Sequence, residues 1–264
     1  MDRTTKDIDG FEIIETVDRS KLLALRESVF GIIDKHIPLG SDNIESALNE
    51  LHARSTSLSD GEFNDLRTKI IYEINDTIDC GGIIYDAFKD YIEKELGPDL
   101  LVQKNSNLVI QRPFDNNPSE IHRDAPLNSC YELVMWVPLV DCFNTKSMYM
   151  VKYGETKSLY ETLNNDQDWE KFERDAINSA ERPTVKFGQA LAFSTTVLHG
   201  STINQENETR VSLNIRYKNI FSPSGLKNQL QFFEILKTSN ITKLGSDLEF
   251  DVELFNNSGR TQES

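Results

Sequence analysis

Hydrophobic residues follow two different periods along the chain, and the change falls near residue 98. In the first hundred residues they recur every three to four positions, which predicts four helices packed through one face. The first helical stripe is preceded by a short apolar run at residues 10–16, which predicts a strand. The four stripes are Leu22, Leu25, Val29, Ile33; Ile44, Leu48, Leu51; Leu66, Ile70, Ile74; and Ile84, Phe88, Tyr91, Ile92. Ser59 and Glu62 have capping-box spacing at the start of the third helix.

Beyond residue 98 the pattern becomes one of short runs rich in β-branched and aromatic residues, which predicts strands separated by polar turns. These runs are residues 108–111, 121–124, 131–140, 147–153, 184–193, 197–203 and 210–220. A polar helical stretch, residues 154–182, interrupts them. Residues 226–236 predict a closing helix, and the tail after Phe255 is expected to fray.

Many strands with helices gathered at one end of the sequence predict a mainly β chain with α: a double-stranded β-helix (jelly roll, cupin-like) with an N-terminal helical buttress. We find no internal repeat and no linker composition, so we expect one domain, 1–264. Its parts would be a helical buttress (1–100), a jelly-roll core (101–221) carrying the insertion 154–182, and a C-terminal helix and tail (222–264).

Acidic residues outnumber basic ones by 43 to 28, a net charge of −15. This excess argues against a nucleic-acid groove and against an anionic membrane surface, because both need clustered cations. Most of it lies in residues 1–100, so the strand region is nearly neutral. The polar start and the three cysteines without a Cys-x-x-Cys pair favour a cytoplasmic protein. We expect a small-molecule partner and leave the oligomeric state open.

Two of the four histidines stand in the strand region, and one has a carboxylate two residues later. His122 and Asp124 flank Arg123, and positions i and i+2 of a strand share a face, so both reach one metal. His199 is the other histidine of this region. Two histidines and a carboxylate form the facial triad that holds Fe(II) and leaves positions open for a chelating ligand and O2. We therefore predict these three residues as metal ligands and catalytic centre.

The strand predicted after His199 offers a carboxylate anchor. By the two-residue period of a strand, one face carries Arg210, Ser212, Asn214 and Arg216. A guanidinium with a hydroxyl two residues along suits bidentate capture of a carboxylate. Arg210, with Ser212 beside it, is the predicted anchor.

These motifs together carry a family resemblance. His122-Arg123-Asp124, the runs GQALAF (188–193) and VLHGS (197–201), and Arg210 in an Arg-x-Ser setting resemble the Fe(II)/2-oxoglutarate-dependent oxygenases. Within them the chain is similar to the phytanoyl-CoA-hydroxylase-like branch, and to the small oxygenases of sporadic carbohydrate gene clusters. The likeness covers about residues 103–221. It implies iron at the triad, 2-oxoglutarate and O2 as cosubstrates, and the distal carboxylate of 2-oxoglutarate on Arg210. Further cosubstrate contacts are implied for Ser201 and Trp136. Gln111 ends the strand before His122 and would reach either the cosubstrate or the substrate.

The substrate is the least determined part of this interpretation. The resemblance implies hydroxylation of a small molecule such as a sugar or sugar conjugate, and the carboxylate of Asp124 argues against halogenation. Candidate substrate residues are Arg216, Lys146 and Asn214, with a buried acid as the alternative partner of Arg216. Residues 154–182 fall where a lid would cover the site. Two alternatives stay open: a non-catalytic jelly-roll binding protein, and a cupin-like metalloenzyme that does not use 2-oxoglutarate. The anchor at Arg210 argues against the second.

Overall fold

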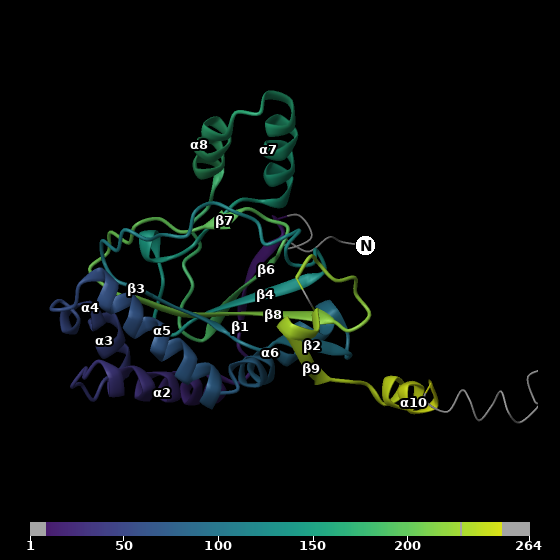
Figure 1. Cartoon of the computed structure of the whole chain (residues 1–264), viewed down its shortest axis with the longest axis horizontal. Coiled ribbons are helices and arrows are strands. Elements are labelled where there is room, and N and C mark those ends of the chain that lie inside the picture. Colours follow the sequence, from purple (N-terminus) through teal and green to yellow (C-terminus); the bar gives the residue numbers. More distant parts are fainter. Residues whose placement is uncertain (1–8, 228, 250–264) are drawn as a thin grey trace, which may run out of the picture.

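The protein folds as a mostly antiparallel sheet with helices (Figure 1). The structure is a computed structural model that describes residues 9–227 and 229–249. Within these ranges a seven-stranded sheet, the major sheet, has the order β1-β6-β4-β8-β2-β9, with β3 also paired to β8. Its strands are β1 (Phe11–Glu15), β2 (Leu100–Gln103), β3 (Asn107–Gln111), β4 (Glu132–Pro138), β6 (Gln189–Ser194), β8 (Arg210–Asn219) and β9 (Phe233–Lys237).

A second, smaller sheet pairs β5 (Tyr149–Met150) with β7 (His199–Gly200). Single bridges extend it, joining His122 to His199 and Met150 to Glu181. This minor sheet brings the two histidines of the strand region side by side.

The helices of the first hundred residues cover one face of the major sheet. They are α2 (Arg19–His36), α3 (Ile44–Asn49), α4 (Leu51–Arg54), α5 (Asp60–Thr77) and α6 (Cys80–Leu96). The predicted capping box is present at the start of α5, where Ser59 and Glu62 bond each other's backbone. Further along, the structure has the turn η1 (Asn144–Lys146) and helices α7 (Tyr153–Asp166), α8 (Trp169–Ser179), α9 (Gln229–Phe232) and α10 (Asn240–Glu249). None of the helices so described is long and apolar enough to cross a bilayer.

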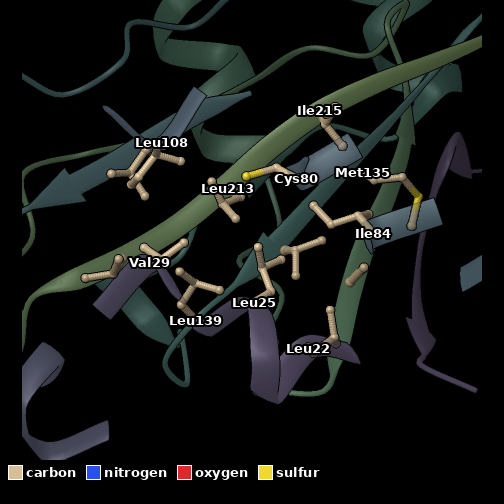
Figure 2. Close-up of a cluster of buried hydrophobic side chains, with 14 of the residues drawn as sticks. Leu22, Leu25, Val29, Cys80, Ile84, Leu108, Met135, Leu139, Leu213 and Ile215 are labelled. Atoms are coloured by element: carbon tan, nitrogen blue, oxygen red, sulfur yellow. The ribbon is translucent and has the colours of Figure 1, made fainter. Parts of the chain in front are cut away.

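The long strand β8 separates an apolar layer from a polar one. Val211, Leu213, Ile215 and Tyr217 join the core formed with the helices. Figure 2 shows Leu22, Leu25 and Val29 of α2 and Cys80 and Ile84 of α6 gathered with Leu213 and Ile215 in this layer. The alternate residues of β8, which begin with Arg210, point to the opposite face. The two-residue period therefore places the polar positions of β8 away from the helices and toward the minor sheet.

Several predicted elements differ from the structure. Residues 121–124 form no strand, because this polar run between Pro118 and Pro126 pairs only through the single bridge at His122. The closing helix predicted at residues 226–236 is mostly wrong: Phe233–Lys237 is the strand β9, which finds an open edge on β2. Two further elements, β2 and α10, are not predicted by the sequence pattern. The prediction for the tail after Phe255 lies outside the described residues.

Candidate metal centre and its cavity

The structure brings His122, Asp124 and His199 together. One ligand atom from each of the three side chains lies within 4.8 Å of the others. The backbones of the two histidines exchange both hydrogen bonds, His122 N to His199 O at 3.0 Å and His199 N to His122 O at 2.9 Å. Their ring centroids are therefore only 4.4 Å apart. A single rung of backbone pairing sets the distance between these two imidazoles.

Each imidazole is held in the tautomer that a metal needs. His122 Nδ1 lies 2.8 Å from the carbonyl of Glu120, and His199 Nδ1 lies 3.0 Å from that of Val197. A carbonyl only accepts, so each Nδ1 donates its proton and leaves a lone pair on Nε2. Burial, with the neighbouring His122 second, lowers the pKa of His199 to about 4. His199 is therefore neutral at pH 7, as a metal ligand must be.

Asp124 is fixed by an arginine on β8. Its Oδ2 accepts from Arg216 Nη2 at 2.7 Å and from Nε at 3.3 Å, and Arg216 Nη1 donates to Gln103 Oε1 at 3.1 Å. The other carboxylate oxygen, Oδ1, lies 4.0 Å from His122 Nε2. Burial opposes ionisation of Asp124, but the charge of Arg216 and the neighbouring histidines outweigh it and lower the pKa of the carboxyl group. One oxygen of a charged carboxylate is thus turned toward the histidines.

Beside the three ligands is a cavity of about 200 Å³. Its walls come from β3, β4, β7 and β8 and from the loops that precede β4 and β5. The lining residues are Asn107, Val109, Ser119, His122, Trp136, Met148, His199, Gly200, Ser201, Arg210, Asn214 and Arg216. A second cavity of about 450 Å³ shares Asn107, Val109, Ser119, Ser201 and Arg210 with it and also reaches Gln111. Arg210 borders both spaces.

The guanidinium of Arg210 has the surroundings of an anion site. The residue is 5% exposed, and its Nε and Nη1 have no hydrogen-bond partner among the described residues. Three buried acceptors nearby are also unpaired in that part of the chain: Ser212 Oγ, Asn214 Oδ1 and Gln111 Oε1. Buried polar groups are normally satisfied, so this cluster lacks a polar ligand. A carboxylate fits the arginine, and a ligand hydroxyl or amide fits the acceptors.

The remaining predicted residues divide into two groups. Trp136 and Ser201 line the smaller cavity, and Ser201 Oγ accepts from the backbone of Ser119 at 2.9 Å. Lys146, expected near the substrate, is instead fully buried away from both cavities. Its ammonium donates to Glu208 at 2.7 Å and to Asn49 at 2.8 Å. These polar partners satisfy the charge, which allows the side chain to be buried.

Arg216 pairs with a buried acid, the alternative to a substrate contact. It lines the smaller cavity, but its donors are occupied by Asp124 and Gln103 rather than free for a substrate. The sequence analysis missed Gln103 in this role, and it missed Asn107 and Ser119 in the cavity wall. Asn107 could have been found, because it stands four residues before Gln111 on the same strand face. Ser119 lies in a loop and gives no such signal.

Comparisons with known proteins agree with this fold. The scan with protein-family models finds no match, and the search of curated proteins finds none either. Among solved structures, the non-heme monooxygenase ThoJ in complex with Ni has a TM-score of 0.50 at 17% identity, covering 88% of this chain and 81% of that chain. Apo ThoJ gives the same score and identity with 82% of its own chain covered. EctD from S. alaskensis with bound Fe has a TM-score of 0.49 at 14% identity, covering 85% and 79%.

The likeness to ThoJ concerns the arrangement of the elements and extends over most of both chains. The resemblance to non-haem oxygenases seen in the sequence is therefore confirmed for the fold: this chain has the fold of a non-heme monooxygenase.

Proposed function

We propose that the protein is a non-haem Fe(II)- and 2-oxoglutarate-dependent oxygenase that hydroxylates a small molecule. One observation carries the proposal: two imidazoles and a carboxylate converge beside a buried arginine with unpaired donors. The donor set suits Fe(II), and the arginine suits the far carboxylate of a 2-oxoacid that chelates the metal. A simple binding protein has no need of both features at one cavity.

The side chains divide the work as follows. His122, Asp124 and His199 would hold the iron, while Arg216 and the two backbone carbonyls on Nδ1 keep the ligands oriented. Arg210 would orient 2-oxoglutarate, with Ser212, Ser201, Trp136 and Gln111 as further contacts. The metal, when bound, supplies the activation of O2 and the oxidation of an unactivated C–H bond, which no side chain can perform.

We also propose the finer architecture. The major and minor sheets would form a double-stranded β-helix whose inner faces enclose the site, with helices α2 to α6 as its buttress. Support comes from the shared core of these helices and β8, and from the polar inner face of β8. Strands β1 and β9, near the two ends of the described chain, both join the major sheet, which supports one domain.

For the substrate we propose a sugar or sugar conjugate. The unpaired carboxamide oxygen of Asn214 and the neighbouring Asn107 offer neutral hydrogen bonds at the cavity wall, which suit hydroxyl groups. The carboxylate of Asp124 favours hydroxylation or desaturation over halogenation, and of the two we propose hydroxylation. Free Cys80, Cys130 and Cys142 support a cytoplasmic location.

Anaerobic titration tests the core of this proposal without knowledge of the substrate. Fe(II) with 2-oxoglutarate should give the weak visible charge-transfer band of the chelate in the wild type. His199→Ala or Asp124→Ala should remove the band, and Arg210→Ala should raise the 2-oxoglutarate concentration that it requires. His36→Ala, a histidine paired to Glu73 far from the site, is the control and should leave it unchanged. A wild-type protein that gives no band would contradict the proposed function. A metal-dependent spectrum that does not change when 2-oxoglutarate is added would favour the cupin-like alternative.

A further inference from the structure

The segment that carries His122 and Asp124 has little regular structure to hold it. Between residues 117 and 131 the described chain forms no strand and no helix. Apart from the rung between His122 and His199, two backbone bonds hold its middle: Ser201 N donates to Ser119 O at 2.9 Å, and Ala125 N donates to Thr195 O, just past β6, at 3.0 Å. The ion pair with Arg216 ties Asp124 to β8. His122 is also the most exposed of the three candidate ligands, with 43% of its side chain accessible. The carbonyl of Glu120 orients its imidazole, and the residues on either side of His122 show what supports the backbone there.

The two sequence neighbours of His122, Ile121 and Arg123, both contact the α7–α8 hairpin. Ile121 packs against a cluster formed by Val151, Leu163, Phe172, Ala176 and Leu198. Arg123 places its guanidinium carbon 4.2 Å from the ring centroid of Tyr160 on α7, which is cation–π distance. The ring of Tyr160 in turn packs on Phe172 of α8, with centroids 5.1 Å apart. The hairpin therefore contacts the residues on both sides of the candidate ligand.

The position of the hairpin does not match a lid. Figure 1 shows α7 and α8 standing side by side beyond β7, on the side away from α2 and α5. Neither helix contributes a residue to the walls of the two cavities at Arg210. Residues 154–182 thus reach the candidate centre through Ile121 and Arg123, and they do not line either cavity.

We propose that the α7–α8 hairpin is a positioning element for the metal centre: it fixes His122 through the packing of Ile121 and the stacking of Arg123 on Tyr160. The inference rests on the proposed function in one respect, that His122 is a metal ligand. The benefit is preorganisation, because a ligand already held in place loses less freedom when the metal binds.

Charge and positioning predict opposite effects of one substitution. Arg123→Gln removes a cation near the metal, which on Coulombic grounds alone would tighten binding of a divalent ion. If the stacking on Tyr160 positions His122, the same change weakens metal binding. Tyr160→Leu removes the aromatic face without a change in charge and retains apolar bulk in the cluster, and Tyr160→Phe restores the face.

The test uses Co(II) as an oxygen-stable probe of the full-length protein. Tyr160→Leu and Arg123→Gln should each weaken Co(II) affinity by about two- to fivefold, the range of one exposed cation–π contact. Tyr160→Phe should bind like the wild type, and so should Glu161→Gln, the control at the exposed neighbouring position. In the metal-free protein, hydrogen exchange at the amides of His122 and Ala125 should accelerate in Tyr160→Leu alone of the three α7 variants.

The outcomes separate the two proposals. A wild-type protein that does not bind Co(II), or binds it equally after His199→Ala, contradicts the metal centre itself. A wild type that binds Co(II), together with unchanged affinity and unchanged exchange in Tyr160→Leu, overturns only the role of the hairpin. Tighter binding by Arg123→Gln also overturns it, since charge alone would then explain the effect.

Discussion

Arg210 and Arg216 form a matched pair, and replacing each with methionine should change stability in opposite directions. Both residues are 5% exposed and point to the same face of β8. Arg216 is paired with Asp124, whereas Arg210 has two donors without a partner in the described chain. Burial accordingly lowers the pKa of Arg210 from its ordinary value. A buried cation without an anion lowers the stability of the ligand-free protein. An anionic ligand that binds this cation would offset the loss.

The magnitudes follow from these environments. An unsatisfied buried donor costs about 1–3 kcal/mol, so Arg210→Met should stabilise the ligand-free protein by about that amount. At this chain length each kcal/mol corresponds to a rise of about 2–4 °C in Tm. Arg216→Met leaves the carboxylate of Asp124 buried and alone, which should destabilise the protein by about 3–5 kcal/mol. Loss of a bidentate, charge-assisted contact should weaken 2-oxoglutarate binding to Arg210→Met by at least about a hundredfold.

Thermal unfolding with and without ligand measures both quantities. The wild type with Co(II) should gain about 2.7 kcal/mol when 2-oxoglutarate is added at a hundred times its Kd, and Arg210→Met should gain at most about 0.4 kcal/mol at the same concentration. If Arg210→Met instead lowers Tm as Arg216→Met does, the arginine has structural partners and the reasoning is refuted. Retained stabilisation by 2-oxoglutarate in Arg210→Met would refute it equally.

Three further predictions concern neighbouring features. Gly200→Ala should destabilise the protein by about 1–3 kcal/mol in urea unfolding, because a Cβ there would lie 2.5 Å from the hydroxyl of Tyr149. Lys146→Met should change the free energy of unfolding in urea without weakening 2-oxoglutarate binding. A loss of that binding would show that Lys146 contributes to the site. In the native protein a thiol reagent should label Cys130, which is exposed, long before Cys142, since burial raises the pKa of Cys142 to about 12.

The sequence predicts an element well where a long run of residues repeats one period, so that the element's own residues decide its form. The stripes of α2, α5 and α6 and the alternation of β8 needed only their own residues, and the structure has all four elements. The strand β9 could not be predicted in this way, because Phe233–Lys237 becomes a strand only through the free edge of β2. That edge is set by residues more than a hundred positions earlier, and no local pattern reports it.

At the candidate centre, too, local spacing was informative and long-range pairing was not. The spacing of His122 and Asp124 correctly indicated that both would approach His199, although the assumed strand is absent and a loop places them. The partner of Arg216 depended on which acid the fold brings to β8, so the sequence left substrate and buried acid as competing partners. Lys146 was assigned to the site from its charge alone, and Glu208 and Asn49 satisfy that charge elsewhere.

The paired backbone bonds between His122 and His199 also bear on how such a chain can change over generations. The separation of the two imidazoles is set at that one rung, so it does not depend on the length of the intervening chain. Insertions between the two residues can therefore accumulate without moving the ligands apart, provided that both ends return to the rung. The α7–α8 hairpin lies within this interval, where added length is tolerated and can acquire new contacts.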